Sequence, residues 1–483
     1  MKAPFSPYLS GLADAIRAVV DRLGARYDYV SALATDSVGW RVSISQHVKS
    51  VSTQTMTTER GCVVRVYAGG LYSEAAFNEF DPAGPEATAD ALNEQLERQL
   101  ALLRALDVPP YETGALPDAP EAAFIEMETG RLPEDEDMAA LIDRLTALSD
   151  RGMAEGEAAL GEGAMLDVSA TAQCTHINKL FMTKHRDLRQ SYVYAEGTVA
   201  VDACRNGRNE MAYEGISGRC GPELFDGMDA VLDAALKSAG ELLGAERVEP
   251  GEYDIITAPD ITGLIAHEAF GHGVEMDMFV KGRALGADYL EKRVGSEHVT
   301  MHEGARCADS VTGYAFDDEG TPAGDVVEID RGILKTGICD ALSALRLGVK
   351  PTGNGKRENY EHKVYTRMTN TLFDSGDDDL SDMIASIDRG YLLKGVQSGM
   401  EDPKHWGIQC IIEKGYEIIG GRLTGRVVAP VVMTGYVPDL LGSVSRVDRD
   451  RGVFGNGGCG KGYKEWVKVA DGGPYLKARA RLG

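Results

Sequence analysis

The chain has 483 residues, 43% of them hydrophobic and 26% charged, a composition that excludes collagenous, coiled-coil and wholly disordered proteins. Its 50 Lys and Arg residues against 75 Asp and Glu residues give a net charge of −25. A surface this acidic repels phosphate backbones, so we expect no nucleic acid partner. At roughly 100–200 residues per domain, two or three domains are expected.

The cysteines and the apolar segments bear on the compartment. Eight cysteines are scattered without a CxxC pair, which is typical of reduced thiols, and we expect a cytoplasmic protein. No stretch approaches the roughly 18 apolar residues of a membrane span. The first 20 residues also lack the unbroken apolar segment of a signal peptide, so we predict no membrane association.

The N-terminal part alternates between helical and strand patterns. Apolar residues recur at helical spacing over 9–24, which predicts a first helix. Residues 27–77 are rich in β-branched and aromatic residues between turn signals, and the segment 39–70 within them predicts two or three antiparallel strands. Further helices are predicted at about 88–106 and 136–153.

An acidic segment covers these two helices and the loop between them. Residues 81–158 hold 19 acidic residues, five arginines and no lysine, a net charge of −14. We interpret the segment as a solvated helical surface, and a docking face for a basic partner is the alternative.

The second half of the chain is rich in short strands and in glycine, which makes up 57 of the 483 residues. Strand-like alternation over 163–218 precedes a helix at about 226–243. From Tyr253 onward, strands with Gly-rich turns are interrupted by predicted helices at about 261–278, 340–348 and 380–391.

These patterns predict an α+β fold, with helices and antiparallel strands in the N-terminal half and a β-rich C-terminal domain that carries a candidate metal-binding helix. We expect three domains: 1–85 as an N-terminal α/β domain, 86–218 as a central domain of acidic helices followed by strands, and 219–483 as the C-terminal domain.

The segment APDITGLIAHEAFGHGVEMDM carries the chemistry. It contains His267, Glu268 and His272 in the pattern H-E-x-x-x-H. Imidazole nitrogens are strong zinc ligands, and a carboxylate beside the first His can take a proton from water at the metal. A chance HE pair followed by an unrelated core histidine is the alternative.

The spacing of the two histidines differs from the zinc-peptidase signature H-E-x-x-H by one residue. On an ideal α-helix, residue i+5 lies about 140° round the axis, against about 40° for i+4. Two histidines at i and i+5 therefore reach one ion only from a distorted helix, and Gly271 makes a distortion easier. We predict a π-type bulge or a helix break at 268–272.

A catalytic zinc needs a third protein ligand and an open fourth position. Cys459, in the glycine-rich GVFGNGGCGKGY, offers an accessible thiolate, and Glu275 lies three residues beyond His272. Glu275 can equally orient a ligand from behind. His302 belongs to a second HE pair in a segment that reads as strand and turn, so a structural role is favoured for it.

With these residues in view, the sequence resembles the TldD/PmbA metallopeptidase family, and its TldD branch in particular. Besides HEAFGHGVEMD, the resemblance rests on DDEGTPAGD, GILKTGICDALSALRLG, PTGNGKRENY, RMTNT and GGCGKG. Together these motifs cover nearly all of residues 260–465, and TTERGCVVRVYAGG at 57–70 resembles the first domain of the family.

The resemblance implies a metallopeptidase domain over 219–483 with one Zn²⁺ per chain. It implies His267, His272 and Cys459 as the zinc ligands, Glu268 as the catalytic glutamate, and a place for Glu275 behind the ligands. It also implies a closed dimeric cavity for short or unfolded peptides, in a homodimer or in a heterodimer with a paralogous PmbA-type subunit. Tyr463 departs from the family pattern, which expects Gln a residue or two further on.

We therefore expect zinc-dependent hydrolysis of peptide bonds, with Glu268 as general base. Arg367 and Asn370, in RMTNT, are candidate substrate contacts, and a structural turn is the alternative for both. Two other functions stay open: a non-catalytic scaffold or regulatory subunit with structural zinc, and a zinc hydrolase of a non-peptide amide.

Overall fold

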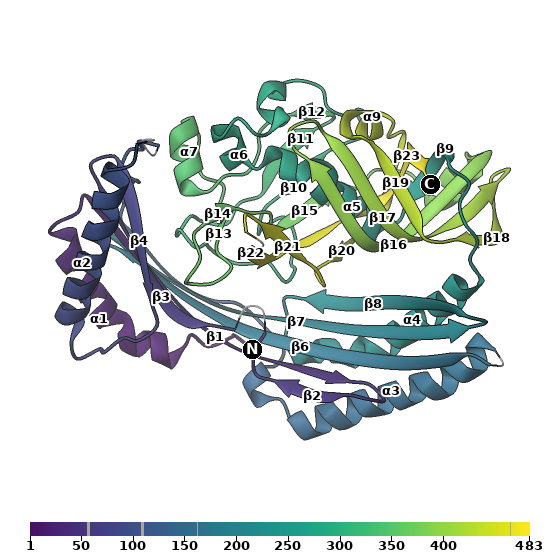
Figure 1. The fold of residues 1–483 in the computed structure, drawn as a ribbon, viewed down its shortest axis with the longest axis horizontal. Helices are drawn as coiled ribbons and strands as arrows, with labels where there is room; N and C mark the ends of the chain where they lie inside the picture. Colours follow the sequence, from purple (N-terminus) through teal and green to yellow (C-terminus); the bar gives the residue numbers. More distant parts are fainter. Residues whose placement is uncertain (56–57, 108–110, 162, 464) are drawn as a thin grey trace.

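The computed structural model describes residues 1–55, 58–107, 111–161, 163–463 and 465–483. It consists of an N-terminal sheet carrying four helices and a β-rich C-terminal domain. In Figure 1 the β6–β8 end of the N-terminal sheet lies below the C-terminal domain, and the end that carries α1 and α2 stands beside it. The predicted α+β class is confirmed. Among the described residues, no helix is both long and apolar enough to cross a bilayer.

The N-terminal sheet has eight strands in the order β4-β3-β1-β6-β7-β5, with β2 paired to β1 and β8 paired to β7. Its strands are β1 (Tyr29–Ile44), β2 (Lys49–Ser52), β3 (Arg60–Ala68), β4 (Leu71–Phe77), β5 (Glu121–Glu126), β6 (Met165–Thr183), β7 (Arg186–Arg205) and β8 (Arg208–Gly218). Among its described residues, the segment 39–70 holds the second part of β1, β2 and β3, so the predicted two or three strands are confirmed.

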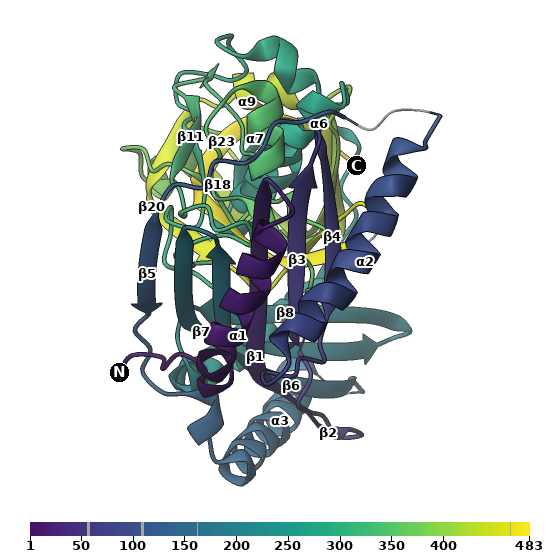
Figure 2. The same cartoon turned by 90° about the vertical axis from the view of Figure 1, so that its left-hand side faces the viewer.

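Two helix pairs cover opposite ends of the long strands, as Figures 1 and 2 show. The apolar faces of α1 and α2 pack on β1, β3 and β4, and those of α3 and α4 pack on β6, β7 and β8. The helices are α1 (Pro7–Gly24), α2 (Pro85–Arg104), α3 (Met138–Leu160) and α4 (Met228–Gly244). Short 3₁₀ turns lie at Pro133–Asp135 and Pro222–Gly227.

The sheet crosses the predicted boundary between residues 85 and 86. Strand β1 pairs with β6 over fourteen residue pairs, from Ser31 opposite Thr183 to Ile44 opposite Ala170. The first two predicted domains therefore share one sheet. Helix α4 lies beyond the predicted boundary at 218, yet it packs on the same sheet.

The C-terminal domain is built on an eleven-stranded sheet in the order β12-β11-β10-β15-β23-β19-β17-β16-β9, with β18 paired to β17 and β20 to β23. Because β9 also pairs with β23, the strands β9, β16, β17, β19 and β23 form a closed ring. The bounds are β9 (Gly251–Thr257), β10 (Met301–Glu303), β11 (Val326–Asp330), β12 (Ile333–Leu334), β15 (Asn370–Phe373), β16 (Arg389–Asp402), β17 (Gly407–Ile419), β18 (Arg422–Val428), β19 (Val431–Tyr436), β20 (Arg446–Phe454) and β23 (Ala470–Leu482).

Short elements complete this domain. Two small hairpins pair β13 (Gly355–Lys356) with β14 (Tyr365–Thr366) and β21 (Gly458–Lys461) with β22 (Glu465–Lys468). The helices are α5 (Pro259–Leu264), a π-helix (Ile265–Gly271), 3₁₀ turns (His272–Val274 and Leu285–Tyr289), α6 (Met276–Val280), α7 (Ala341–Leu347), α8 (Leu380–Ala385) and α9 (Val437–Gly442).

The helix predicted over 380–391 is wrong in its second half. Helix α8 ends at Ala385, and Arg389 already pairs with Ile419 as β16 begins. Sheet pairing outweighs the local helical pattern here, because the residues gain hydrogen-bond partners on both sides of the strand.

The segment from α5 through the π-helix packs on the ring of strands. Ile261, Ile265 and Phe270 belong to the same buried cluster as side chains of β9, β16, β17, β19 and β23. Burial of this apolar face fixes the segment, so its histidines are presented from a rigid support.

Candidate metal centre

The two histidines are brought together by a change of helix type. Residues 265–271 form a π-helix, in which the backbone N–H of His272 donates to the carbonyl of His267. This hydrogen bond between residues i and i+5 widens the turn, so that His267 and His272 lie on the same face of the helix. The predicted distortion at 268–272 is therefore confirmed, and it begins three residues earlier than expected.

Gly271 allows this turn to pack closely against Met368. A Cβ atom at this position would stand 2.3 Å from Sδ of the buried Met368, closer than atoms in contact can approach. The glycine thus permits close packing at the point where the helix is widened.

Three donor atoms converge on one point. The rings of His267 and His272 have centroids 5.1 Å apart and are nearly perpendicular, at 86°. Sγ of Cys459, on β21, lies 3.5 Å from Nε2 of His272, and one ligand atom from each of the three residues lies within 4.8 Å of the others. Both Cys459 and His267 are buried.

This donor set fits a zinc ion. Bonds of about 2.0–2.3 Å in tetrahedral geometry separate neighbouring ligand atoms by roughly 3.3–3.6 Å, and the distance between Cys459 and His272 lies in that range. The buried Nδ1 of His267 has no hydrogen-bond partner, so no described neighbour holds that side of the ring. Two imidazoles and a thiol leave a fourth position of a tetrahedron open.

The charges around Cys459 favour its thiolate. Burial by itself would raise the pKa of the thiol, but the neighbouring His272 and His267 outweigh it and hold this pKa well below its usual value. Burial likewise opposes the charged form of His272, and the negative charges of Glu275 and Cys459 raise its pKa well above the ordinary range. A thiolate is the form of cysteine that binds metals.

Glu275 lies behind His272. Nδ1 of His272 donates to Oε2 of Glu275 at 3.0 Å, which leaves Nε2 facing Cys459. Lys461 contacts Glu275 at 3.0 Å and Asp277 at 2.8 Å. Although burial opposes ionisation, Lys461 and His272 lower the pKa of Glu275 to about 2. The carboxylate therefore fixes the orientation of the imidazole.

Glu268 extends from the π-helix into a cavity of about 790 Å³, which we call the cleft. Its Oε2 lies 3.9 Å from Nε2 of His272. Gly399 of β16 allows it to approach the strand, because a Cβ there would stand 2.5 Å from Cγ of Glu268. The carboxylate is thus held beside the candidate ligand atoms and open to the cleft.

The walls of the cleft come from two strand segments distant in sequence. Residues 396–401 of β16 form one wall, and residues 457–462, which include β21, form the other. Strand β9 pairs with β16 only through Gly390–Leu393. Among the described residues, no strand pairs with that edge of β16 beyond Leu393.

Two more carboxyl groups line the cleft that sequence reasoning missed. Burial raises the pKa of Asp471, on β23, to about 7, and burial raises the pKa of Glu401, on β16, well above its usual value. Both lie in strand patterns without a motif, so only the tertiary structure brings them beside Glu268.

Arg367 and Asn370 are both buried and lie outside the cleft lining. The Arg367 guanidinium donates to the carbonyl of Cys459 and, at 3.1 Å, to that of Glu465. It thereby braces the hairpin that carries the thiol. The Asn370 amide donates to the carbonyl of Gly304 at 2.9 Å, and its oxygen accepts hydrogen bonds from two hydroxyl groups.

His302 is not part of this centre. It lies on β10, with Nδ1 2.7 Å from Asp325 and Nε2 3.2 Å from Asp374. Tyr463, where the sequence departs from the family pattern, is 95% exposed beside the β21–β22 hairpin.

Comparison with known proteins gives consistent similarities. Residues 250–477 match the PmbA/TldA metallopeptidase C-terminal domain. The chain is 33% identical over 257 residues to a metalloprotease of Methanocaldococcus jannaschii, covering 53% of this chain and 56% of that protein. It is 27% identical over 474 residues to a metalloprotease of Synechocystis, covering 95% and 96%.

A zinc metalloprotease TldD homolog of Saccharolobus solfataricus is 28% identical over 290 residues, covering 59% of this chain and 62% of that protein. The matches to the Methanocaldococcus and Saccharolobus proteins therefore span less than two thirds of those relatives. The fold is similar to the crystal structure of TldE from Thermococcus kodakarensis, with a TM-score of 0.75, 18% identity, and coverage of 97% of this chain and 100% of that one.

Proposed function

Through its residues 250–477 the chain belongs to the PmbA/TldD metallopeptidase family, and we propose that it is a zinc-dependent peptidase of short or unfolded peptides. The observation that carries this proposal is the π-turn, which brings His267 and His272 to the Cys459 thiol with a carboxylate beside them. The names of the relatives as metalloproteases, one of them a zinc metalloprotease, support it.

His267, His272 and Cys459 would hold one zinc ion per chain. Such an ion supplies a Lewis acid that lowers the pKa of water towards about 7 and polarises a carbonyl. The lowered pKa of Cys459 supports this assignment, because it favours the thiolate, the form in which cysteine binds a metal.

Glu268 would act as the general base. Its carboxylate takes the proton of the attacking water and passes it to the leaving nitrogen as the peptide bond breaks. Its position on the π-helix, directly after His267, keeps the carboxylate within one turn of both histidines. A purely structural zinc site has no need of such a proton acceptor, so Glu268 favours catalysis over a scaffold role.

The substrate would bind as an extended strand along the free edge of β16. This edge runs beside the cleft from Val396 to Glu401. Hydrogen bonds from main chain to main chain recognise any extended peptide with little regard to its side chains. A chain that is folded into its own secondary structure cannot offer these groups, which would favour unfolded substrates.

The test combines zinc analysis with cleavage of an unfolded peptide. We expect Glu268→Gln to keep one zinc per chain and to lose at least a hundredfold in kcat, because general-base catalysis typically contributes about 10²–10⁴-fold. We expect Cys459→Ser to lose zinc. Equal cleavage by the wild type and Glu268→Gln would refute the base, and full zinc occupancy in Cys459→Ser would refute the third ligand.

A further inference from the structure

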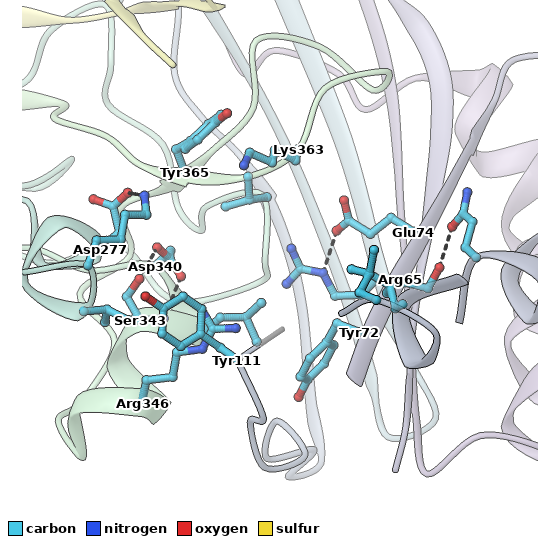
Figure 3. Close-up of a pocket in the computed structure, with 18 of the residues that line it drawn as sticks. Arg65, Tyr72, Glu74, Tyr111, Asp277, Asp340, Ser343, Arg346, Lys363 and Tyr365 are labelled. Atoms are coloured by element: carbon cyan, nitrogen blue, oxygen red, sulfur yellow. Dashed lines mark hydrogen bonds and ion pairs between the residues drawn. The ribbon is translucent and has the colours of Figure 1, made fainter. Parts of the chain in front are cut away.

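A second cavity, of about 580 Å³, lies between the N-terminal sheet and the C-terminal domain. Figure 3 shows its two facing walls. One wall comes from β3, β4 and the end of α2, and the other comes from α6, α7 and residues 363–365. This volume is in the range of about 300–1,000 Å³ typical of ligand sites, which prefer domain interfaces.

Several charged groups of this cavity are already paired within the protein. Arg65 contacts Glu74 at 2.6 Å, and Lys281 contacts Asp277 at 2.9 Å. Nε of Arg346 donates to Thr113 at 2.8 Å, while the guanidinium lies 4.9 Å from the ring centroid of Tyr111. Asp340 accepts from the hydroxyl groups of Ser343 and Thr366. Among the described residues, no carboxylate forms an ion pair with the lining cations Arg346 and Lys363, and Nζ of Lys363 lies 4.4 Å from the ring centroid of Tyr365.

The rest of the lining includes much apolar surface, so we call this cavity the apolar pocket. Its apolar lining includes Leu102, Leu103, Leu106, Tyr111, Val280 and Leu342. Leu102 and Tyr111 are 69% and 56% exposed, respectively. Large apolar side chains gathered at a concave surface typically mark a binding site.

The apolar pocket adjoins the cleft. Lys281 and Tyr365 line both cavities. Between them runs a chain of ion pairs in which Lys461 joins Asp277, on the side of the apolar pocket, to Glu275, behind His272. The two cavities therefore share a boundary at Lys281 and Tyr365.

We propose that the apolar pocket is a substrate subsite that binds a bulky apolar side chain of the peptide at a distance from the bond that is cleaved. The inference rests on the proposed peptidase function and adds a second criterion by which the protein would select its substrates. Folded proteins bury most of their Leu, Ile and Phe side chains, whereas unfolded peptides expose them. The subsite would therefore select unfolded chains by their side chains, where the β16 edge selects them by their backbone.

The test uses three quenched fluorescent peptides with the same short cleavable core. One is the core alone, and the others carry extensions at both ends that are either apolar (Leu-Phe-Leu) or polar (Ser-Gly-Ser). They are compared on the wild type, on Leu102→Arg, and on the matched control Leu423→Arg. Leu423 is 50% exposed on β18, and it lines neither cavity.

We expect the wild type to have a KM for the apolar peptide about tenfold lower than for the polar one, the size expected for burying one apolar side chain. Leu102→Arg removes this difference and changes the KM of the core by less than twofold, while Leu423→Arg keeps it. Equal KM values for the two extended peptides on the wild type, or an unchanged preference in Leu102→Arg, would overturn the subsite.

A measurement of peptide binding tests this inference independently of the peptidase proposal. If the wild type cleaves none of the peptides, the proposed function fails, and fluorescence anisotropy with labelled apolar peptide on Glu268→Gln still decides the subsite. About tenfold weaker binding by Glu268→Gln with Leu102→Arg supports it, and equal binding overturns it. A change of mass in light scattering of Leu102→Arg without a change in peptide affinity would assign the pocket to a second copy of the chain.

Discussion

Glu275→Gln tests whether the carboxylate behind His272 sets the strength of the metal site. Glu275 is only 2% exposed and accepts the Nδ1 proton of His272 at 3.0 Å. The substitution keeps the shape of the side chain and removes its charge. A hydrogen bond to a charged group contributes about 1.5–3 kcal/mol, and each 1.4 kcal/mol is a factor of ten.

We therefore expect zinc to bind about 10–100-fold more weakly to Glu275→Gln, which agrees with the usual effect of losing such a partner. Competition with a chromophoric chelator measures the affinity, and thermal melting of the metal-free protein checks the fold. Glu291→Gln is the matched control, because Glu291 is an exposed acid that pairs with Lys335.

An affinity within twofold of the wild type would refute the reasoning about Glu275, provided that the metal-free variant melts as the wild type does. Such a result would mean that the packing of the π-helix alone orients His272. A loss of zinc equal in Glu275→Gln and Glu291→Gln would instead assign the effect to the net charge of the protein.

Three further predictions concern packing, pH and assembly. Gly271→Ala should lose zinc and about 1–3 kcal/mol of stability, because its Cβ would meet Met368. Adding Met368→Ala should recover part of the zinc binding, which a double-mutant cycle with zinc titration would measure. Burial opposes ionisation of Glu74, but Arg65 and Arg357 hold its pKa far below 4.5. The ionised Glu74 therefore stabilises the folded protein above about pH 4.5, and this stabilisation is lost as the pH falls. Glu74→Gln should thus lower the free energy of unfolding, measured in urea, by about 3–5 kcal/mol at pH 7 and by progressively less below pH 4.5. An equal loss of stability at pH 7 and pH 3 would contradict this. Light scattering should find about twice the 51.9 kDa of one chain, or a complex with a PmbA-type paralogue when the two are produced together, whereas a lone monomer in both cases would contradict the expected dimer.

Local sequence was sufficient for much of the secondary structure and for the chemistry of the candidate site. The helices α1, α2 and α4 lie within a few residues of their predicted ranges, because each has an apolar stripe of helical period that the N-terminal sheet buries. Helix α7 also matches its predicted range, and α3 starts near its predicted start but ends seven residues later, at Leu160. The spacing of His267 and His272 was itself enough to predict a widened helix, since no straight α-helix places residues i and i+5 on one face.

Pairings between distant segments could not be predicted in this way. The composition changes near residue 85 and suggests a boundary, but β1 pairs with β6, more than a hundred residues later. The pattern over 380–391 suggests a helix, and the pairing of Arg389 with Ile419 ends it. Strand partners depend on which edges the whole fold leaves free, and a local pattern carries no record of them.

The same division holds at the site. The sequence by itself determined the donor types, their spacing and the need for a bent helix, because these follow from the chemistry and the geometry of consecutive residues. Only the tertiary structure decided that Glu275 and Lys461 meet behind His272, that Asp471 and Glu401 lie in the cleft, and that an apolar pocket adjoins it. Those residues lie on separate elements, and their approach depends on packing across the whole domain.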